Sequence, residues 1–132
     1  MNGTKYEKAD QAVEDMIIKI LTKYNQKFGH LRTDMFINVF KLSEKSSWDA
    51  RIRLNSGFMR VVVDKPVILE IWRESWDAHT EKQRALTIYH ELCHLTTNEK
   101  TGDLKLQQHD VQDFKECIEK FGLNGEKIED II

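Results

Sequence analysis

One segment constrains this chain more than any other, because it spaces two histidines and a glutamate for presentation on one helix. Residues 88–95 read Ile-Tyr-His-Glu-Leu-Cys-His-Leu and contain the pattern H-E-x-x-H at His90, Glu91 and His94. On a helix that advances about 100° per residue, these three side chains fall within one arc of roughly 100°. Both imidazoles can then reach one metal ion, with the carboxylate beside it. The pattern is typical of zinc hydrolases.

The opposite face of the same helix is apolar, so the helix has one face to anchor it and one to present ligands. The apolar face consists of Ala85, Ile88, Tyr89, Leu92 and Leu95. Thr80 and Gln83 match a capping box, in which each side chain caps a backbone N–H of the first turn. We therefore expect the helix to begin near Glu81 and to run to about Thr96.

A catalytic zinc site needs a third protein ligand and an open position for water. His109 is the best candidate, because it lies at the expected start of a last helix, after a loop long enough to return across the polar face. Asp110 and Asp113 are rival ligands. Asp113 follows His109 by one helical turn and is expected to orient its imidazole, whereas Asp110 is equally suited to cap the helix.

Glu91 lies next to the first ligand, and at this spacing its role is that of a general base. Zinc lowers the pKa of a bound water to about 7, so a carboxylate within reach can take its proton and later pass it to a leaving amine. The sequence does not identify the donor that stabilises the oxyanion. Cys93 would compete with His94 for space and is expected to be a small buried residue, while His30 and His79 have no partners at ligand spacing.

Composition limits the class of protein. With 132 residues and 40% hydrophobic residues, the chain is expected to form one domain over residues 1–132. The formal net charge is -2, without a basic block, so neither nucleic acid nor a membrane surface is indicated as a partner. The N-terminus is polar, no apolar run is long enough to span a membrane, and Cys93 and Cys117 do not suggest a disulfide framework. These features favour a cytoplasmic protein.

The periodicity of apolar residues predicts an α+β fold with a small, mainly antiparallel sheet of three or four strands, arranged as a meander. We expect an N-terminal helix, the H-E-x-x-H helix and a C-terminal helix around them. Helices are predicted over Thr4–Phe28, Glu81–Thr96 and Val111–Phe121, strands over Met35–Leu42, Trp48–Leu54, Phe58–Val63 and Val67–Trp72, and a polar loop over Glu74–His79. An edge strand from residues 58–72 is expected to pair with an extended peptide above the metal.

Two segments also carry a resemblance to a known family. The run from Arg84 to His94, together with the later His-Asp-Val-Gln-Asp-Phe at 109–114, resembles the phage metallopeptidase family, which is similar to the SprT-like zinc metalloproteases. The resemblance implies a minimal zincin-like domain of phage or prophage origin. It also implies that His90, His94 and His109 are zinc ligands and that Glu91 is the general base.

The leading hypothesis is a zinc-dependent metallopeptidase that hydrolyses peptide bonds of a cytosolic protein through a metal-activated water. The alternative is a catalytically weak, zinc-stabilised binding or inhibitor protein of a mobile element. Activity on an unfolded protein, abolished by chelation, separates the two, because a pure binder loses only stability when its metal is removed. A third hypothesis, zinc-dependent hydrolysis of nucleic acid, is disfavoured by the nearly balanced charge.

Overall fold

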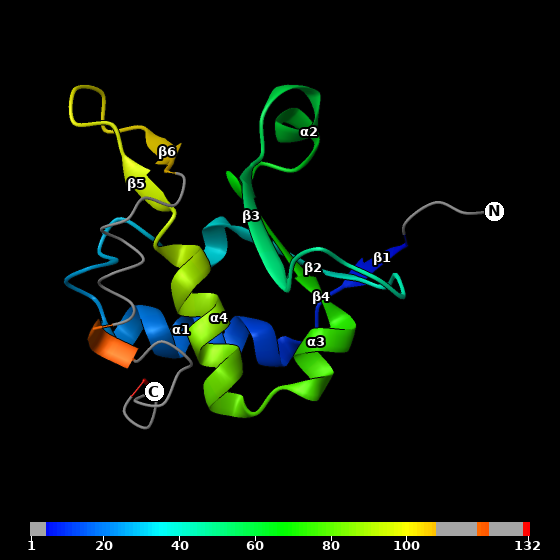
Figure 1. Cartoon of the computed structure of the whole chain (residues 1–132). Coiled ribbons are helices and arrows are strands. Elements are labelled where there is room, and N and C mark those ends of the chain that lie inside the picture. The colour runs from blue at the N-terminus through cyan, green and yellow to red at the C-terminus, as the bar shows by residue number, and fades with distance from the viewer. Residues whose placement is uncertain (1–4, 108–118, 122–130) are drawn as a thin grey trace.

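The computed structural model describes residues 5–107, 119–121 and 131–132. It contains a four-stranded sheet, helices packed on one of its faces, and a separate two-stranded hairpin (Figure 1). The helices are α1 (Gln11–Lys23), the short 3-10 helix η1 (Thr33–Met35), α2 (Gly57–Val62), α3 (Arg73–Ala78) and α4 (Glu81–Leu92). The strands are β1 (Tyr6–Lys8), β2 (Phe36–Lys41), β3 (Ala50–Leu54), β4 (Val67–Trp72), β5 (Leu95–Thr97) and β6 (Leu104–Leu106). The α+β class predicted from the sequence is confirmed.

The large sheet is mixed, in the order β1-β2-β4-β3. β2 and β4 run parallel at its centre, while β1 and β3 pair antiparallel on the two outer sides. The expectation of a meander is therefore wrong, because β4 lies between β2 and β3. β4 suits this central place, since alternate residues Val67, Leu69 and Ile71 are at most 1% exposed. Pro66 directly precedes the strand, where it removes no N–H from the ladder.

The prediction of a strand over Phe58–Val63 is also wrong, because this segment forms α2. Its residues are typical of strands, but they do not join the ladder and most of them are exposed. Gly57 begins the helix with a positive φ of 62°, and the Asn55 amide donates to the carbonyl oxygens of Val63 and Lys65. The Asn55 bonds close residues 55–65 into a compact loop at the end of β3.

Several element boundaries differ from those expected. The predicted first helix, Thr4–Phe28, begins only at Gln11, because residues 6–8 pair with β2 as β1 instead, and it ends early, at Lys23. The polar loop expected over Glu74–His79 is wrong, because residues 73–78 form α3. The predicted last helix lies mostly outside the described residues, but Phe121 and Ile131 are buried in the core.

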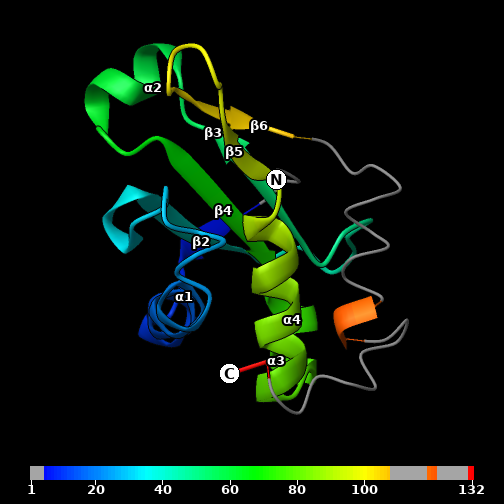
Figure 2. The ribbon, with the colours of Figure 1, turned by 90° about the vertical axis from the view of Figure 1, so that its left-hand side faces the viewer.

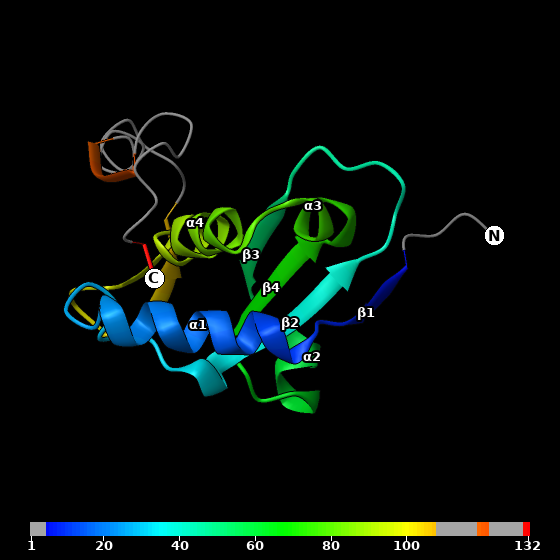
Figure 3. The same cartoon turned by 90° about the horizontal axis from the view of Figure 1, so that it is seen from below.

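The core lies between the sheet and α1 and α4, which cover the same face of the sheet (Figures 2 and 3). Alternation along β3 and β4 sends every second side chain into this core. On the opposite face, the carboxylate of Glu70 is buried and is held by Arg51 and Arg53 of β3. No helix of the described part is long and apolar enough to cross a membrane.

Candidate active site

Helix α4 brings the H-E-x-x-H segment to the sheet. The capping box is present, since the Thr80 hydroxyl accepts a hydrogen bond from the Gln83 N–H and the Gln83 side chain bonds back to the Thr80 N–H. The helix begins at Glu81 as predicted but ends at Leu92, so His94 lies in the turn that follows. The expected continuation to Thr96 is wrong, because residues 95–97 leave the helix and form β5.

The apolar face of α4 anchors the site, as expected. Ala85, Ile88, Tyr89 and Leu92 are at most 1% exposed. The ring of Tyr89 packs edge-on against three aromatic rings, with centroid separations of 4.9 to 5.4 Å. These rings belong to Tyr24, Phe28 and Phe121. Tyr89 is therefore part of the core and does not face the motif side of the helix.

The two motif histidines converge on one side of the helix. The ring centroids of His90 and His94 are 5.4 Å apart, and the ring planes stand at 84° to each other. Zinc binds imidazole nitrogen at about 2.0–2.1 Å, so two rings at this separation can share one ion. The pair therefore fits a zinc ion by both its donor type and its spacing.

His94 is oriented by a residue that the sequence analysis missed. Its Nδ1 lies 2.6 Å from the backbone carbonyl oxygen of Gln107, and the Gln107 N–H donates to the His94 carbonyl at 2.6 Å. Because a carbonyl oxygen only accepts, Nδ1 carries the proton and the lone pair is on Nε2. The turn-forming residues between Thr97 and Leu104 were the only sequence signal for the hairpin that creates this contact.

Glu91 is desolvated next to the histidines. It is 8% exposed, and one carboxylate oxygen lies 3.8 Å from His94 Nε2. Burial raises the pKa of the Glu91 carboxyl from 4.5 to about 7, and the nearby His90 lowers it by a smaller amount. A carboxyl with such a pKa can both accept and release a proton near neutral pH.

A cavity of about 300 Å³ opens beside Glu91 and His94. Its other walls are the start of β3 (Ala50 to Ile52) and the end of the β5–β6 hairpin (Leu106 and Gln107). β3 is an outer strand of the sheet, whereas β4 is central. The edge strand beside the site therefore precedes α2 in the sequence, and the expectation that it lies within residues 58–72 is wrong.

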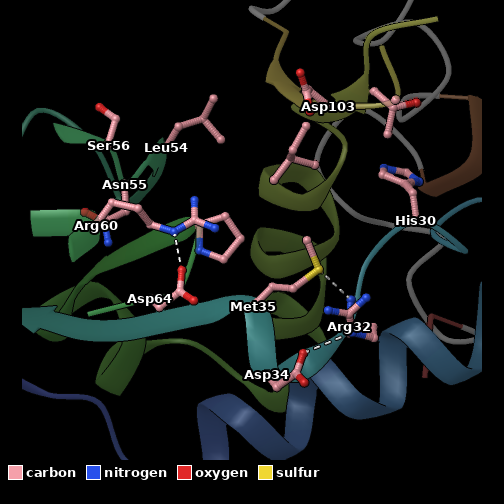
Figure 4. A pocket seen from close by; sticks show the side chains of 14 residues that line it. His30, Arg32, Asp34, Met35, Leu54, Asn55, Ser56, Arg60, Asp64 and Asp103 are labelled. Carbon is pink, nitrogen blue, oxygen red and sulfur yellow. Dashed lines mark hydrogen bonds and ion pairs between the residues drawn. The ribbon is translucent and has the colours of Figure 1, made fainter. Parts of the chain in front are cut away.

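A larger cavity, of about 650 Å³, lies further along β3 and is lined by none of the H-E-x-x-H residues. His30 and Asp103 lie on one side of it, Asn55, Ser56, Arg60 and Asp64 on the other, and Met35 at its base (Figure 4). His30 Nε2 lies 2.7 Å from the backbone carbonyl oxygen of Leu95, within hydrogen-bond distance. His30 thus supports the hairpin and is separate from the histidine pair.

Three of the other candidate site residues lie outside the described residues, namely His109, Asp110 and Asp113. Their roles therefore stay predictions. In the part of the chain that the structure describes, no three His, Cys, Asp or Glu side chains come together as a metal site. His79 lies at the end of α3 beside Ser75, and Cys93 packs half-buried against the core.

Two converging histidines beside a buried carboxylate, on a helix and the turn that follows it, next to a sheet edge, are typical of metal-dependent hydrolases. A family model described as Putative phage metallopeptidase matches residues 4–132. The chain belongs to this family, and its description is that of a metal-dependent peptidase. No curated protein and no solved structure matched the chain.

Proposed function

We propose that the protein is a zinc-dependent metallopeptidase that hydrolyses peptide bonds of a cytosolic protein, acting as a single domain over residues 1–132. His90, His94 and His109 hold the zinc ion, and Glu91 is the general base. One observation carries the proposal. The rings of His90 and His94 converge, with centroids 5.4 Å apart, beside the buried Glu91 and next to an outer strand of the sheet.

The choice of His109 as third ligand is supported by the end of the hairpin. Gln107 is joined to His94 by two hydrogen bonds, so the chain leaves β6 beside the histidine pair. Residue 109 follows two peptide units later and can be at most about 7 Å further along an extended chain. Asp113, one helical turn beyond in the expected last helix, is proposed to orient the His109 ring.

Zinc, when bound, lowers the pKa of water and polarises the scissile carbonyl. The residues of the chain supply the rest. Glu91 accepts a proton from the attacking water and returns it to the leaving amine, and its buried position 3.8 Å from His94 Nε2 keeps its carboxylate next to the histidine pair. The carbonyl of Gln107 keeps the proton of His94 on Nδ1, so the lone pair of the ring is on Nε2, which would serve as the donor to zinc.

The substrate is proposed to bind as an extended chain along β3. This strand has a partner on one side only among the described strands, and its start lines the cavity that contains Glu91 and His94. Pairing with an edge strand uses backbone hydrogen bonds, so the substrate segment must be extended.

The proposal is tested by incubating the purified protein with an unfolded protein substrate, with zinc present or removed by a chelator. We expect cleavage with zinc, none after chelation, and recovery when zinc is added back. A lower melting temperature without any cleavage under either condition would identify a zinc-stabilised binding protein instead.

A substitution in the hairpin tests how the third ligand is positioned. Gly102 has a φ of +74°, and a Cβ there would meet no other atom of the described residues within 4 Å, so Gly102→Ala strains only the backbone. We expect a loss of stability of about 1–2 kcal/mol and weaker zinc binding, because the hairpin sets the place of Gln107. Thermal unfolding and zinc titration against a competing chelator measure the two effects.

Gly57→Ala is the matched control, since Gly57 has a φ of +62° and equally open surroundings but lies in α2. It should reduce stability by a similar amount and leave zinc affinity unchanged. Equal zinc affinity in both variants and the wild type would show that the hairpin does not position the site.

A further inference from the structure

Helix α2 exposes an unusual amount of apolar surface. Phe58 is 79% exposed and Val61 84%, and Met59 and Val62 are more than half exposed. Large apolar side chains that are exposed together on a single-domain protein commonly mark a binding surface. Arg60, the one charged residue of the helix, is paired with Asp64 at 2.8 Å. We call Phe58, Met59, Val61 and Val62 the α2 patch.

Helix α2, which carries the patch, lies at one end of a path that begins at the candidate site, although the four patch side chains do not themselves line the cavities on this path. The smaller cavity, with Glu91 and His94, is bounded by Ile52 of β3 and Leu106 of β6. The larger cavity follows along the same two strands, bounded by Leu54 and Leu104, and reaches α2 at Ser56 and Arg60. In Figures 1 and 2, α2 and the β5–β6 hairpin stand at the same end of the molecule.

The larger cavity does not favour an acidic ligand. Its two arginines are each paired with a carboxylate of the same cavity wall, Arg32 with Asp34 and Arg60 with Asp64. The cavity is also lined by Asp103, so its carboxylates outnumber its arginines. Met35, Leu54, Pro66 and Leu104 provide apolar lining among these polar side chains. A cavity of this kind accommodates an extended segment without acidic side chains.

The size of the α2 patch indicates a transient partner. Four side chains with these exposures present on the order of 400–500 Å². A stable protein interface buries about 800 Å² on each partner, so the patch alone is too small for a second copy of this chain or another lasting partner. A substrate chain fits, because it is held at the catalytic site as well.

We infer that the larger cavity and the α2 patch beyond it form a substrate subsite for an extended segment, in which the patch selects large apolar side chains. This inference rests on the proposed peptidase function. Gly57, the start of α2, is five positions after Ile52, which lies beside the site, so we expect the selected side chains to begin about five residues from the scissile bond. The enzyme would thus prefer unfolded segments, in which such side chains are accessible.

Two peptides that share one cleavage sequence test the inference, with quenched fluorescence as the readout. One carries Leu and Phe in the flanks on both sides, and the other carries Ser at the same positions. We expect kcat/KM of the wild type to be about 10- to 100-fold higher for the apolar peptide. In the variant Phe58→Ser/Val61→Ser this preference should disappear, mainly through KM, while cleavage of the serine peptide is unchanged.

The variant should fold normally, because both side chains are mostly exposed. Ile18→Ser/Leu42→Ser is the control, and it should keep the preference. It replaces two exposed apolar residues, one on α1 and one directly after β2.

Equal cleavage of both peptides by the wild type, or an unchanged preference in Phe58→Ser/Val61→Ser, overturns the inference alone. Cleavage of neither peptide overturns the proposed function and the inference with it. A dimer that dissociates on Phe58→Ser/Val61→Ser would assign the patch to self-association and also overturn the inference.

Discussion

Replacing Glu91 with glutamine should leave zinc bound and reduce peptide hydrolysis by about 10²- to 10⁴-fold, the usual contribution of a general base. This corresponds to roughly 3–5 kcal/mol in the activation barrier. The amide keeps the size of the side chain but cannot accept a proton near neutral pH. Burial already disfavours the charged carboxylate, so the neutral amide should fit the same place without loss of stability. Metal content and the initial rate of cleavage, measured on the same sample, check the prediction.

Glu81→Gln is the matched control, because Glu81 lies on the same helix but is exposed and forms an ion pair with Lys19 at 3.2 Å. Exposed ion pairs contribute little to stability, so this variant should retain full activity. Wild-type rates in the Glu91 variant would contradict the role of Glu91 as the base. Loss of zinc from that variant would mean that Glu91 helps to bind the metal.

Helix α4 was the most predictable part of the site, because local interactions decide its start and its orientation. The bonds between Thr80 and Gln83 span three residues, and the buried face repeats with the helical period. The end of the helix was not predictable in this way. Residues 95–97 prefer the hairpin with β6, a pairing whose partner strand begins seven positions later, at Leu104.

The sheet order depended on contacts that no local pattern contains. β2 and β4 pair in parallel across the residues of β3 and α2, and their register is set by burial on both sides. For segment 58–63, in contrast, the local pattern itself was misleading. Its β-forming residues predicted a strand, although they have no buried face in the structure. Exposed apolar residues of this kind depart from the usual pattern, and functional surfaces are where such departures are expected.

The environment of the site was also only partly visible in the sequence. Spacing brought His90, Glu91 and His94 together, but the burial of Glu91 and the cavity that it shares with Ala50, Ile52 and Leu106 arise only in the folded chain. The bond between His94 and Gln107 depends on backbone geometry, to which the side chain at position 107 gives no clue. Strict alternation along residues 48–54 did identify a strand with one wet face, and that strand is the sheet edge beside the site.

Replacing His109 with alanine should remove most of the zinc and, with it, the activity. Disturbing residues that merely orient a ligand already costs 10- to 100-fold in metal affinity, so loss of a ligand should exceed about 100-fold. We expect the purified variant to contain well under one zinc per chain and to melt at the temperature of the chelated wild type. Asp113→Ala should retain zinc with affinity reduced within the 10- to 100-fold range, because its proposed role is to orient the ring. Metal analysis, competitive zinc titration and thermal unfolding measure these differences.

His79→Ala controls for the loss of a histidine as such, since His79 lies at the end of α3 beside Ser75, and it should bind zinc like the wild type. If His109→Ala binds zinc normally while Asp110→Ala or Asp113→Ala loses it, the third ligand is a carboxylate. The hairpin still delivers that residue to the site, because residues 110 and 113 also follow Gln107, which is bonded to His94. If all three variants bind zinc like the wild type, the proposed ligand set is wrong, because the segment after β6 then contributes none of these side chains to the metal.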